Sequence, residues 1–209
     1  LIPSWALYSG KIDQINDLIS RLLFYDGPYL IGLSEGRKCS ILKTIFFIYP
    51  VCMRYANLLY DPLLKDLSMT HANGINEEYR FENGAFSSFG EPDKIWTIIK
   101  EKPGYKIINL VNLTGIKSPR WNEAKENGPT EVKNIIVKAL VEEEVEDVFL
   151  ASPDINNGFP QKLDYEYEHF ARGRAVKFTI PKLQVWDMVY IRVGGTEKTQ
   201  CEKSNITNL

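Results

Sequence analysis

The amino-acid sequence predicts the end of an α/β barrel followed by an all-β antiparallel sandwich of Greek-key type. Helical periodicity and one short apolar run characterise the first part of the chain. After Asp61 the chain consists of short strand-like segments separated by turn residues, with no credible helix among them. This change predicts three parts: the barrel end at residues 1–61, the sandwich at 62–194 and a frayed polar tail at 195–209.

The first part has the element order helix, buried strand, loop, helix. Apolar residues recur at the spacing of one helix face at Ile12, Ile15, Leu18, Ile19, Leu22 and Leu23. Asp26-Gly27-Pro28 ends this helix, and the unalternating apolar run at 29–33 is typical of a strand buried on both faces, as in a parallel barrel. A second helix is expected from Ile41 to about Tyr60, kinked or divided at Pro50.

Eight strands are expected after this helix, each bounded by turn residues such as Asn83-Gly84 and Pro103-Gly104. They cover residues 63–70, 94–100, 105–113, 132–141, 147–150, 162–167, 174–180 and 185–193. Short strands at regular spacing without intervening helices are typical of an antiparallel sandwich. Apolar and polar side chains alternate at 175–180, which predicts a strand with one wet face.

Composition excludes several classes of partner. Lys and Arg number 25 and Asp and Glu 27, for a net charge of -2, so nothing in the charge favours nucleic acid or an anionic membrane surface. The most apolar stretch, residues 44–53, is far shorter than the roughly 20 residues of a membrane span, so we expect it to be buried in protein. The three cysteines and two histidines have no zinc-ligand spacing, and we predict neither a metal site nor a cofactor.

The chain starts at Leu1-Ile2-Pro3, without an initiator Met, a basic n-region or a signal cleavage site. We therefore expect an N-terminally truncated piece of a longer protein.

Eight segments of the second part occur in one order. They are 54–61 (RYANLLYD), 95–100 (IWTIIK), 105–113 (YKIINLVNL), 120–122 (RWN), 128–130 (GPT), 148–154 (VFLASPD), 176–181 (VKFTIP) and 186–190 (WDMVY). With this order the chain resembles the C-terminal part of glycoside hydrolase family 66, which contains the endo-dextranases and the cycloisomaltooligosaccharide glucanotransferases. Upstream, residues 27–36 look like a degraded form of the family's last barrel strand and the acidic loop after it.

The resemblance implies an enzyme that acts on α-1,6-glucan (dextran) and isomaltooligosaccharides by retaining hydrolysis or transglycosylation. Retention needs two carboxyl groups about 5–5.5 Å apart. In the family both lie on earlier barrel strands, so we expect the catalytic residues upstream of this chain and no activity from the chain alone. The resemblance also implies an extracellular or cell-surface protein, because dextran does not enter a cell intact.

Two residues are candidates for contact with substrate. Glu35 is the one carboxylate at the C-terminal end of a plausible barrel strand, where barrel enzymes place their sites; the alternative is a solvated loop residue. Trp121 lies in a polar loop between Arg120 and Asn122, where an indole can stack on a glucose ring; a purely structural role is equally compatible with the sequence.

Other polar and aromatic residues have a structural interpretation as the favoured one. Asp154 can bind calcium or a hydroxyl group, but Ser-Pro-Asp is more typical of a turn whose Asp bonds backbone N–H groups. We expect Trp96 and Trp186 in the core and the acidic run 142–147 as a solvated strand connection rather than a cation site. Asn112 fits a glycosylation sequon but is predicted within a strand.

Two rival hypotheses remain open. In the first, the sandwich is a non-catalytic module that either binds α-glucan or has a purely structural role. In the second, the chain is a cytosolic interaction domain unrelated to sugar.

Overall fold

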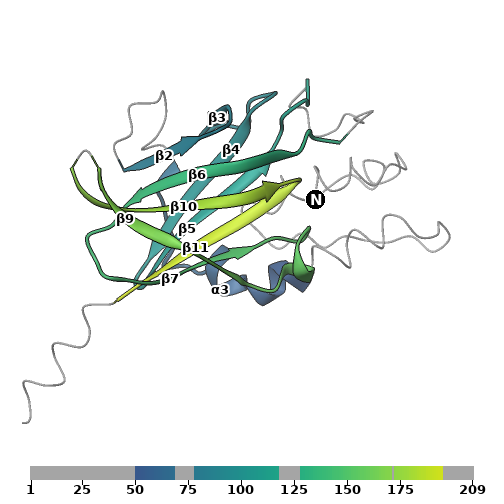
Figure 1. Ribbon diagram of the computed structural model, residues 1–209. Coiled ribbons are helices and arrows are strands. Elements are labelled where there is room, and N and C mark those ends of the chain that lie inside the picture. Colours follow the sequence, from purple (N-terminus) through teal and green to yellow (C-terminus); the bar gives the residue numbers. More distant parts are fainter. Residues whose placement is uncertain (1–49, 69–77, 118–127, 171, 195–209) are drawn as a thin grey trace, which may run out of the picture.

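The computed structural model describes residues 50–68, 78–117, 128–170 and 172–194 of the chain. Within these residues two β-sheets pack face to face, and a short helical segment covers the outer face of one of them (Figure 1). The antiparallel sandwich predicted from the sequence is therefore confirmed. The expected helix at 12–23, the expected barrel strand at 29–33 and the tail at 195–209 lie outside the described residues.

The larger sheet has seven strands in the order β1-β4-β5-β11-β7-β8, with β3 added beside β4. Their bounds are β1 Lys65–Asp66, β3 Phe86–Ser87, β4 Ile95–Lys102, β5 Tyr105–Asn112, β7 Val145–Ala151, β8 Gln161–Leu163 and β11 Trp186–Val193. Every pair in this sheet is antiparallel except β3 with β4. Gly104, at a φ of 80°, lies in the tight turn between β4 and β5.

The smaller sheet has four antiparallel strands in the order β2-β6-β10-β9. Their bounds are β2 Tyr79–Glu82, β6 Val132–Leu140, β9 Tyr165–Phe170 and β10 Gly173–Leu183. The prediction of one wet face at 175–180 is confirmed, because Val176, Phe178 and Ile180 are buried whereas Lys177 and Thr179 are not.

Two expectations for single strands are wrong. The strand expected at 162–167 is divided at Asp164 into β8, which belongs to the larger sheet, and β9, which belongs to the smaller one. The chain changes sheets there at a corner of the sandwich. Of the strand expected at 63–70, the described residues 63–68 contain only the two residues of β1.

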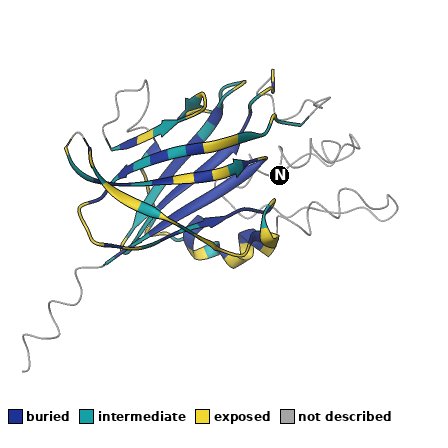
Figure 2. Cartoon of the chain, viewed as in Figure 1, coloured by how far each residue is buried: buried dark blue, intermediate teal, exposed yellow. Residues whose placement is uncertain are grey.

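The larger sheet is the middle of three layers and is buried on both faces (Figure 2). Along β11, Val189, Ile191 and Val193 belong to the cluster between the two sheets. Trp186, Met188 and Tyr190 belong to the cluster under the helical segment. This double burial explains why β5 and β11 are almost continuously apolar in the sequence instead of alternating.

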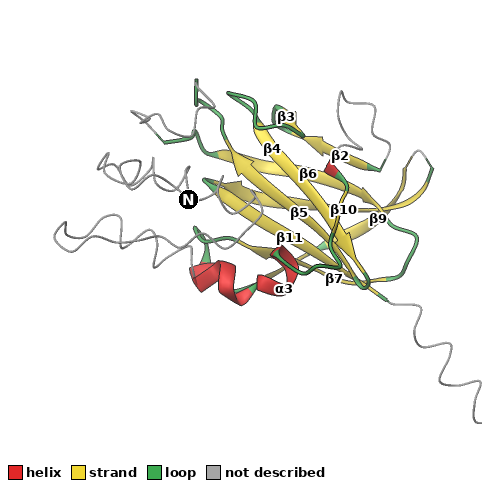
Figure 3. Cartoon of the chain, turned by 180° about the vertical axis from the view of Figure 1, so that it is seen from behind, coloured by secondary structure: helices red, strands yellow, loops and turns green. Residues whose placement is uncertain are grey.

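The helical layer, drawn in red in Figure 3, consists of residues 50–54 and, after a turn at Tyr55, helix α3, Ala56–Leu59. The predicted helix up to about Tyr60 is confirmed for this described part. Val51, Cys52 and Leu58 are buried against the larger sheet. Burial raises the pKa of the Cys52 thiol to about 12, so this thiol stays protonated and unreactive at neutral pH. No helix among the described residues is long and apolar enough to span a membrane.

Candidate functional site at one end of the sandwich

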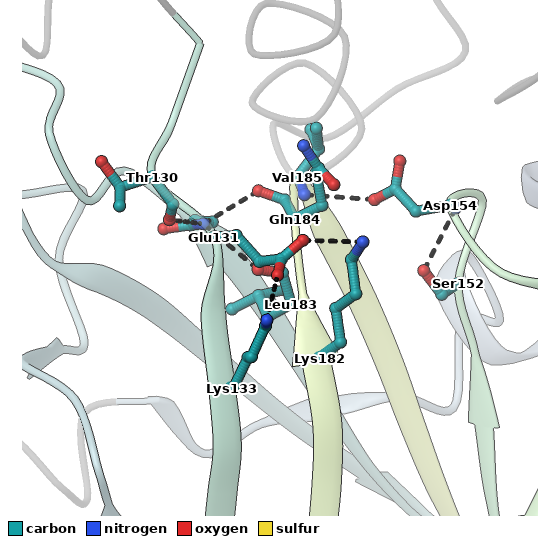
Figure 4. A network of polar contacts seen from close by, with 10 residues as sticks. Thr130, Glu131, Lys133, Ser152, Asp154, Lys182, Leu183, Gln184 and Val185 are labelled. Atoms are coloured by element: carbon teal, nitrogen blue, oxygen red, sulfur yellow. Dashed lines mark hydrogen bonds and ion pairs between the residues drawn. The ribbon is translucent and has the colours of Figure 1, made fainter.

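Polar side chains gather at the end of the sandwich where β10 turns into β11 (Figure 4). We call this part, made of residues 112–117, 128–131, 151–155 and 182–187, the hairpin end. The chain leaves the described residues at Lys117 and returns at Gly128, on either side of the segment that contains Trp121. Trp121 itself and Glu35 lie outside the described residues, so the structure places neither candidate.

Asn112 ties three segments of the hairpin end together. Its Nδ2 donates to the carbonyl oxygens of Thr130 and Gln184, both at 2.8 Å, and more weakly to that of Leu183 at 3.5 Å. Its Oδ1 accepts from the backbone N–H of Thr114 at 3.0 Å. The predicted position of Asn112 within a strand is confirmed. The nitrogen that glycosylation modifies is thus buried and bonded in the folded chain.

Asp154 bonds backbone N–H groups, as the favoured interpretation of Ser-Pro-Asp predicts. Its Oδ2 accepts from the backbone N–H of Val185 at 3.1 Å, and its own N–H donates to the Ser152 Oγ at 3.2 Å. The carboxylate therefore accepts a hydrogen bond from the β10–β11 hairpin, 31 residues further along the chain. The residue as a whole is exposed, but partial burial of its carboxyl group raises the pKa of Asp154.

Asp187 is the feature that the sequence analysis missed as a candidate. It is 0% exposed, and neither carboxyl oxygen has a hydrogen-bond partner among the described residues. Burial raises the pKa of Asp187 to about 8; the Ser152 hydroxyl lowers it and the Asp154 carboxylate raises it further. An acidic residue inside the otherwise apolar run 185–191 was the available signal.

On the solvent side of the hairpin end, Glu131 lies between two lysines. Its carboxylate is 2.7 Å from the Lys182 Nζ and 3.2 Å from the Lys133 Nζ, and these ammonium groups lower its pKa (Figure 4). Exposed ion pairs of this kind add little to stability. Among the described residues no cation acts on the buried Asp187; the charged group near it is the Asp154 carboxylate.

The two tryptophans of the described residues differ in burial. Trp186 is fully buried and its Nε1 donates to the Asn109 Oδ1 at 3.3 Å, so its predicted place in the core is confirmed. Trp96 is partly buried against the cluster under the helical segment, and its Nε1 donates to the Ser88 carbonyl at 3.2 Å. Both indoles are therefore packing residues of the larger sheet.

The acidic run 142–147 is a solvated connection that continues into β7, as predicted. Glu144 accepts from Arg174 at 3.1 Å and from the Tyr167 hydroxyl at 3.0 Å. Asp147 pairs with Lys162 at 2.6 Å and with Arg192. Across the part of the chain that the structure describes, no three His, Cys, Asp or Glu side chains are arranged to hold a metal ion.

A second set of contacts holds the helical segment on the sandwich. We call these contacts, between residues 51–55 and 157–159, the helix clamp. The Tyr55 hydroxyl donates to the Gly158 carbonyl at 2.9 Å, and the Arg54 guanidinium lies 3.9 Å from the centroid of the Phe159 ring. Gly158 has a φ of 71°, and a Cβ there would lie 2.3 Å from the Val51 Cγ2. Only glycine fits this close approach.

Exposed apolar side chains gather around the helical layer. Met53, Tyr60, Leu63 and Phe159 are exposed over 56%, 44%, 65% and 52% of their surface. Four of the six large apolar side chains that are exposed among the described residues thus lie in or next to the helical layer and its clamp.

The fold and its contacts define a β-sandwich with a preceding helical segment fixed on one face. Residues 42–190 match the model of glycosyl hydrolase family 66, and the chain belongs to this family.

Two cycloisomaltooligosaccharide glucanotransferases of Niallia circulans are 31% and 30% identical to it over 167 residues. This match covers 78% of the chain but 16% of each relative, so the chain spans about a sixth of their length. A crystal structure of a cycloisomaltooligosaccharide glucanotransferase from Paenibacillus sp., complexed with cycloisomaltoheptaose, has the same fold with a TM-score of 0.64 and 29% identity. It is matched over 73% of this chain and 21% of the Paenibacillus chain.

Proposed function

We propose that this chain is the C-terminal part of a dextranase-like enzyme that acts on α-1,6-glucan by retaining hydrolysis or transglycosylation. The observation that carries the proposal is the family match over residues 42–190, which takes in the whole described sandwich except the last residues of β11. Isomaltooligosaccharides are the corresponding short substrates or products. Because dextran does not enter cells intact, the whole protein acts outside the cell or at its surface.

The catalytic carboxylates lie outside this chain. Retention requires two carboxyl groups about 5–5.5 Å apart that both reach the sugar. Asp154 and Asp187 are neighbours at the hairpin end, but Asp187 is fully buried and Asp154 holds the Val185 N–H. This pair therefore serves the fold rather than the reaction.

The sandwich supports the catalytic part through the helix clamp. Residues 1–61 form the end of the catalytic (β/α)8 barrel, and the helix that ends near Tyr60 is its closing helix. The buried side of this helix is fixed to the larger sheet, and the exposed Met53, Tyr60 and Leu63 are covered by the barrel. The sandwich thus fixes the position of the last helix of the barrel.

Release of oligosaccharides from dextran tests this division of labour. The 209-residue chain, incubated with dextran, is expected to give no product, because both catalytic carboxylates are missing. Reducing ends or cyclic isomaltooligosaccharides formed by the isolated chain would contradict the proposal.

The alternative is a module that binds α-glucan through the hairpin end. It is favoured by one observation: the segment with Trp121 begins and ends at the described residues Lys117 and Gly128 of this polar surface. In an affinity gel that contains dextran, a binding module is retarded and Trp121→Ala abolishes the retardation. Phe89→Ala, at an aromatic residue exposed over 47% of its surface, is the matched control. Migration that dextran leaves unchanged would favour the structural role.

A further inference from the structure

The side chain of Asp187 enters the space between the two sheets. Asp187 pairs with Leu110 of β5, and the next odd-numbered residues of β11, Val189 and Ile191, belong to the cluster between the sheets. Successive side chains of a strand alternate between its faces, so Asp187 is on the same side as these two. The ladder with β7 ends where Met188 pairs with Ala151, which brings Ser152 to the level of Asp187.

This position gives an ionised Asp187 little compensation: the Ser152 hydroxyl, which donates to the Trp186 carbonyl at 3.4 Å, favours the ionised form, but it forms no hydrogen bond with the carboxyl oxygens. These two oxygens have no hydrogen-bond partner among the described residues, and the charged group near them, the Asp154 carboxylate, has the same sign. Lys182 of β10 lies near Asp154 but is bound to Glu131, which also holds Lys133. Leu110 of β5 and its partner on β4, Thr97, carry no charge. A buried carboxylate without a partner is one of the costliest groups that a fold can hold.

We propose that Asp187 keeps its proton in the folded chain at neutral pH, and that loss of this proton in alkali loosens the hairpin end. This inference is independent of the proposed function. It assigns to Asp187 the role of a buried proton site in which a neutral carboxylic acid replaces an ion pair.

The structure shows how the charge of Asp187 reaches the rest of the hairpin end. The neighbouring Asp154 carboxylate holds the Val185 N–H, so repulsion between two carboxylates acts directly on the β10–β11 turn. Asn112 bonds the carbonyls of Gln184 in that turn and of Thr130, near the base of the segment with Trp121. A displacement of the β10–β11 turn is therefore expected to move Thr130 as well, because Asn112 bonds both.

Urea unfolding of the 209-residue chain between about pH 5 and pH 9 tests the proposal. The ordinary pKa of the group is 3.8, and the value in the folded chain is raised to about 8. Between these values the folded state binds one proton more than the unfolded state. The folding equilibrium constant is therefore expected to fall about tenfold for each pH unit up to about pH 8 and to level off above it.

The variant Asp187→Asn is neutral and nearly isosteric, so it should lack this slope. Asp147→Asn, at a surface ion pair, is the control and should keep it. Parallel pH profiles of the wild type and Asp187→Asn would overturn the proposal. If Asp187→Asn does not fold, the proton count of the wild type decides: unfolding near pH 6 in weak buffer should release about one proton more than near pH 9.

Asp154→Asn tests the neighbour. It removes the like charge but keeps an oxygen that can accept from the Val185 N–H. The pH at which the folding equilibrium constant levels off should therefore move to a lower value. A levelling-off pH equal to that of the wild type would contradict the claim that the Asp154 carboxylate repels an ionised Asp187. A rise in Tm with calcium or magnesium that Asp187→Asn abolishes would also overturn the proposal, because a cation would then neutralise the pair.

Discussion

The hydroxyl of Tyr55 donates a hydrogen bond to the carbonyl of Gly158, 103 residues further along the chain and 2.9 Å away. This contact joins the helical segment that precedes the sandwich to the loop after β7. The Tyr55 ring also lies 5.9 Å from the ring of Tyr190 on β11. The helical segment is thus fixed to the centre of the larger sheet and to its periphery.

Gly158→Ala should destabilise the chain by about 2–3 kcal/mol, because it combines a positive φ with a clash against Val51. Urea unfolding measures the change. Gly173→Ala is the control: its new Cβ would meet the Leu140 Cδ1 at an ordinary 3.7 Å. Equal effects of the two substitutions would show that the close approach at Gly158 is not a constraint.

Tyr55→Phe should cost about 1 kcal/mol, because the Gly158 carbonyl loses its donor while the ring keeps its packing. The decrease in Tm on a calorimetric scan reports this change. Tyr105→Phe removes a hydroxyl that bonds to none of the described residues and should leave Tm nearly unchanged. A Tyr55→Phe variant as stable as the wild type would argue against the helix clamp as a stabilising contact.

Asn112→Ala should lower the free energy of unfolding by about 2–3 kcal/mol, because it removes a buried amide that donates to the carbonyls of Thr130 and Gln184 and accepts from the Thr114 N–H. Hydrogen exchange should show faster exchange at the hairpin end than in the rest of the sandwich. Asn57→Ala, on the exposed side of α3, is the matched control. Uniform acceleration across the sandwich would contradict a local role for Asn112.

Asp147→Asn should lower Tm at neutral pH and make Tm less sensitive to acid. Lys162 and then Arg192 lower the pKa of Asp147 below its ordinary 3.8. The carboxylate therefore stabilises the fold at pH values above that, and this contribution is lost as the pH falls through the lowered pKa. The variant should accordingly show a flatter fall of Tm in acid than the wild type. Glu142→Gln, on the exposed connection before β7, should reproduce the wild-type profile, and a steeper fall for Asp147→Asn would contradict the account.

The long strands of the sandwich were predictable because they are long and strongly apolar. The expected strand at 132–141 corresponds to β6, Val132–Leu140, and that at 185–193 to β11, Trp186–Val193. Burial on both faces or on one face gave each of them an unambiguous pattern. The two-residue strand β3 and the four-residue β2 carry too few side chains for a periodicity, and both were missed.

Tertiary context explains the other differences. Residues 162–167 have one continuous strand pattern, but their two halves pair with strands far apart in the sequence, β7 and β10. The local sequence at Asp164 does not predict this change of sheet. Asp187 was overlooked for a different reason: the apolar run 185–191 around it signals burial, but only the packing of both sheets shows that its carboxyl oxygens have no hydrogen-bond partner among the described residues.

The central claim is that this sandwich ends a family 66 enzyme whose catalytic carboxylates are outside the chain. Determination of the coding sequence immediately upstream of Leu1 tests it most directly. The account predicts barrel strands that end in an Asp and a Glu, followed without interruption by the helix that reaches Tyr60. A stop codon or an unrelated domain at that place would contradict it and leave the sandwich as a separate binding or structural module.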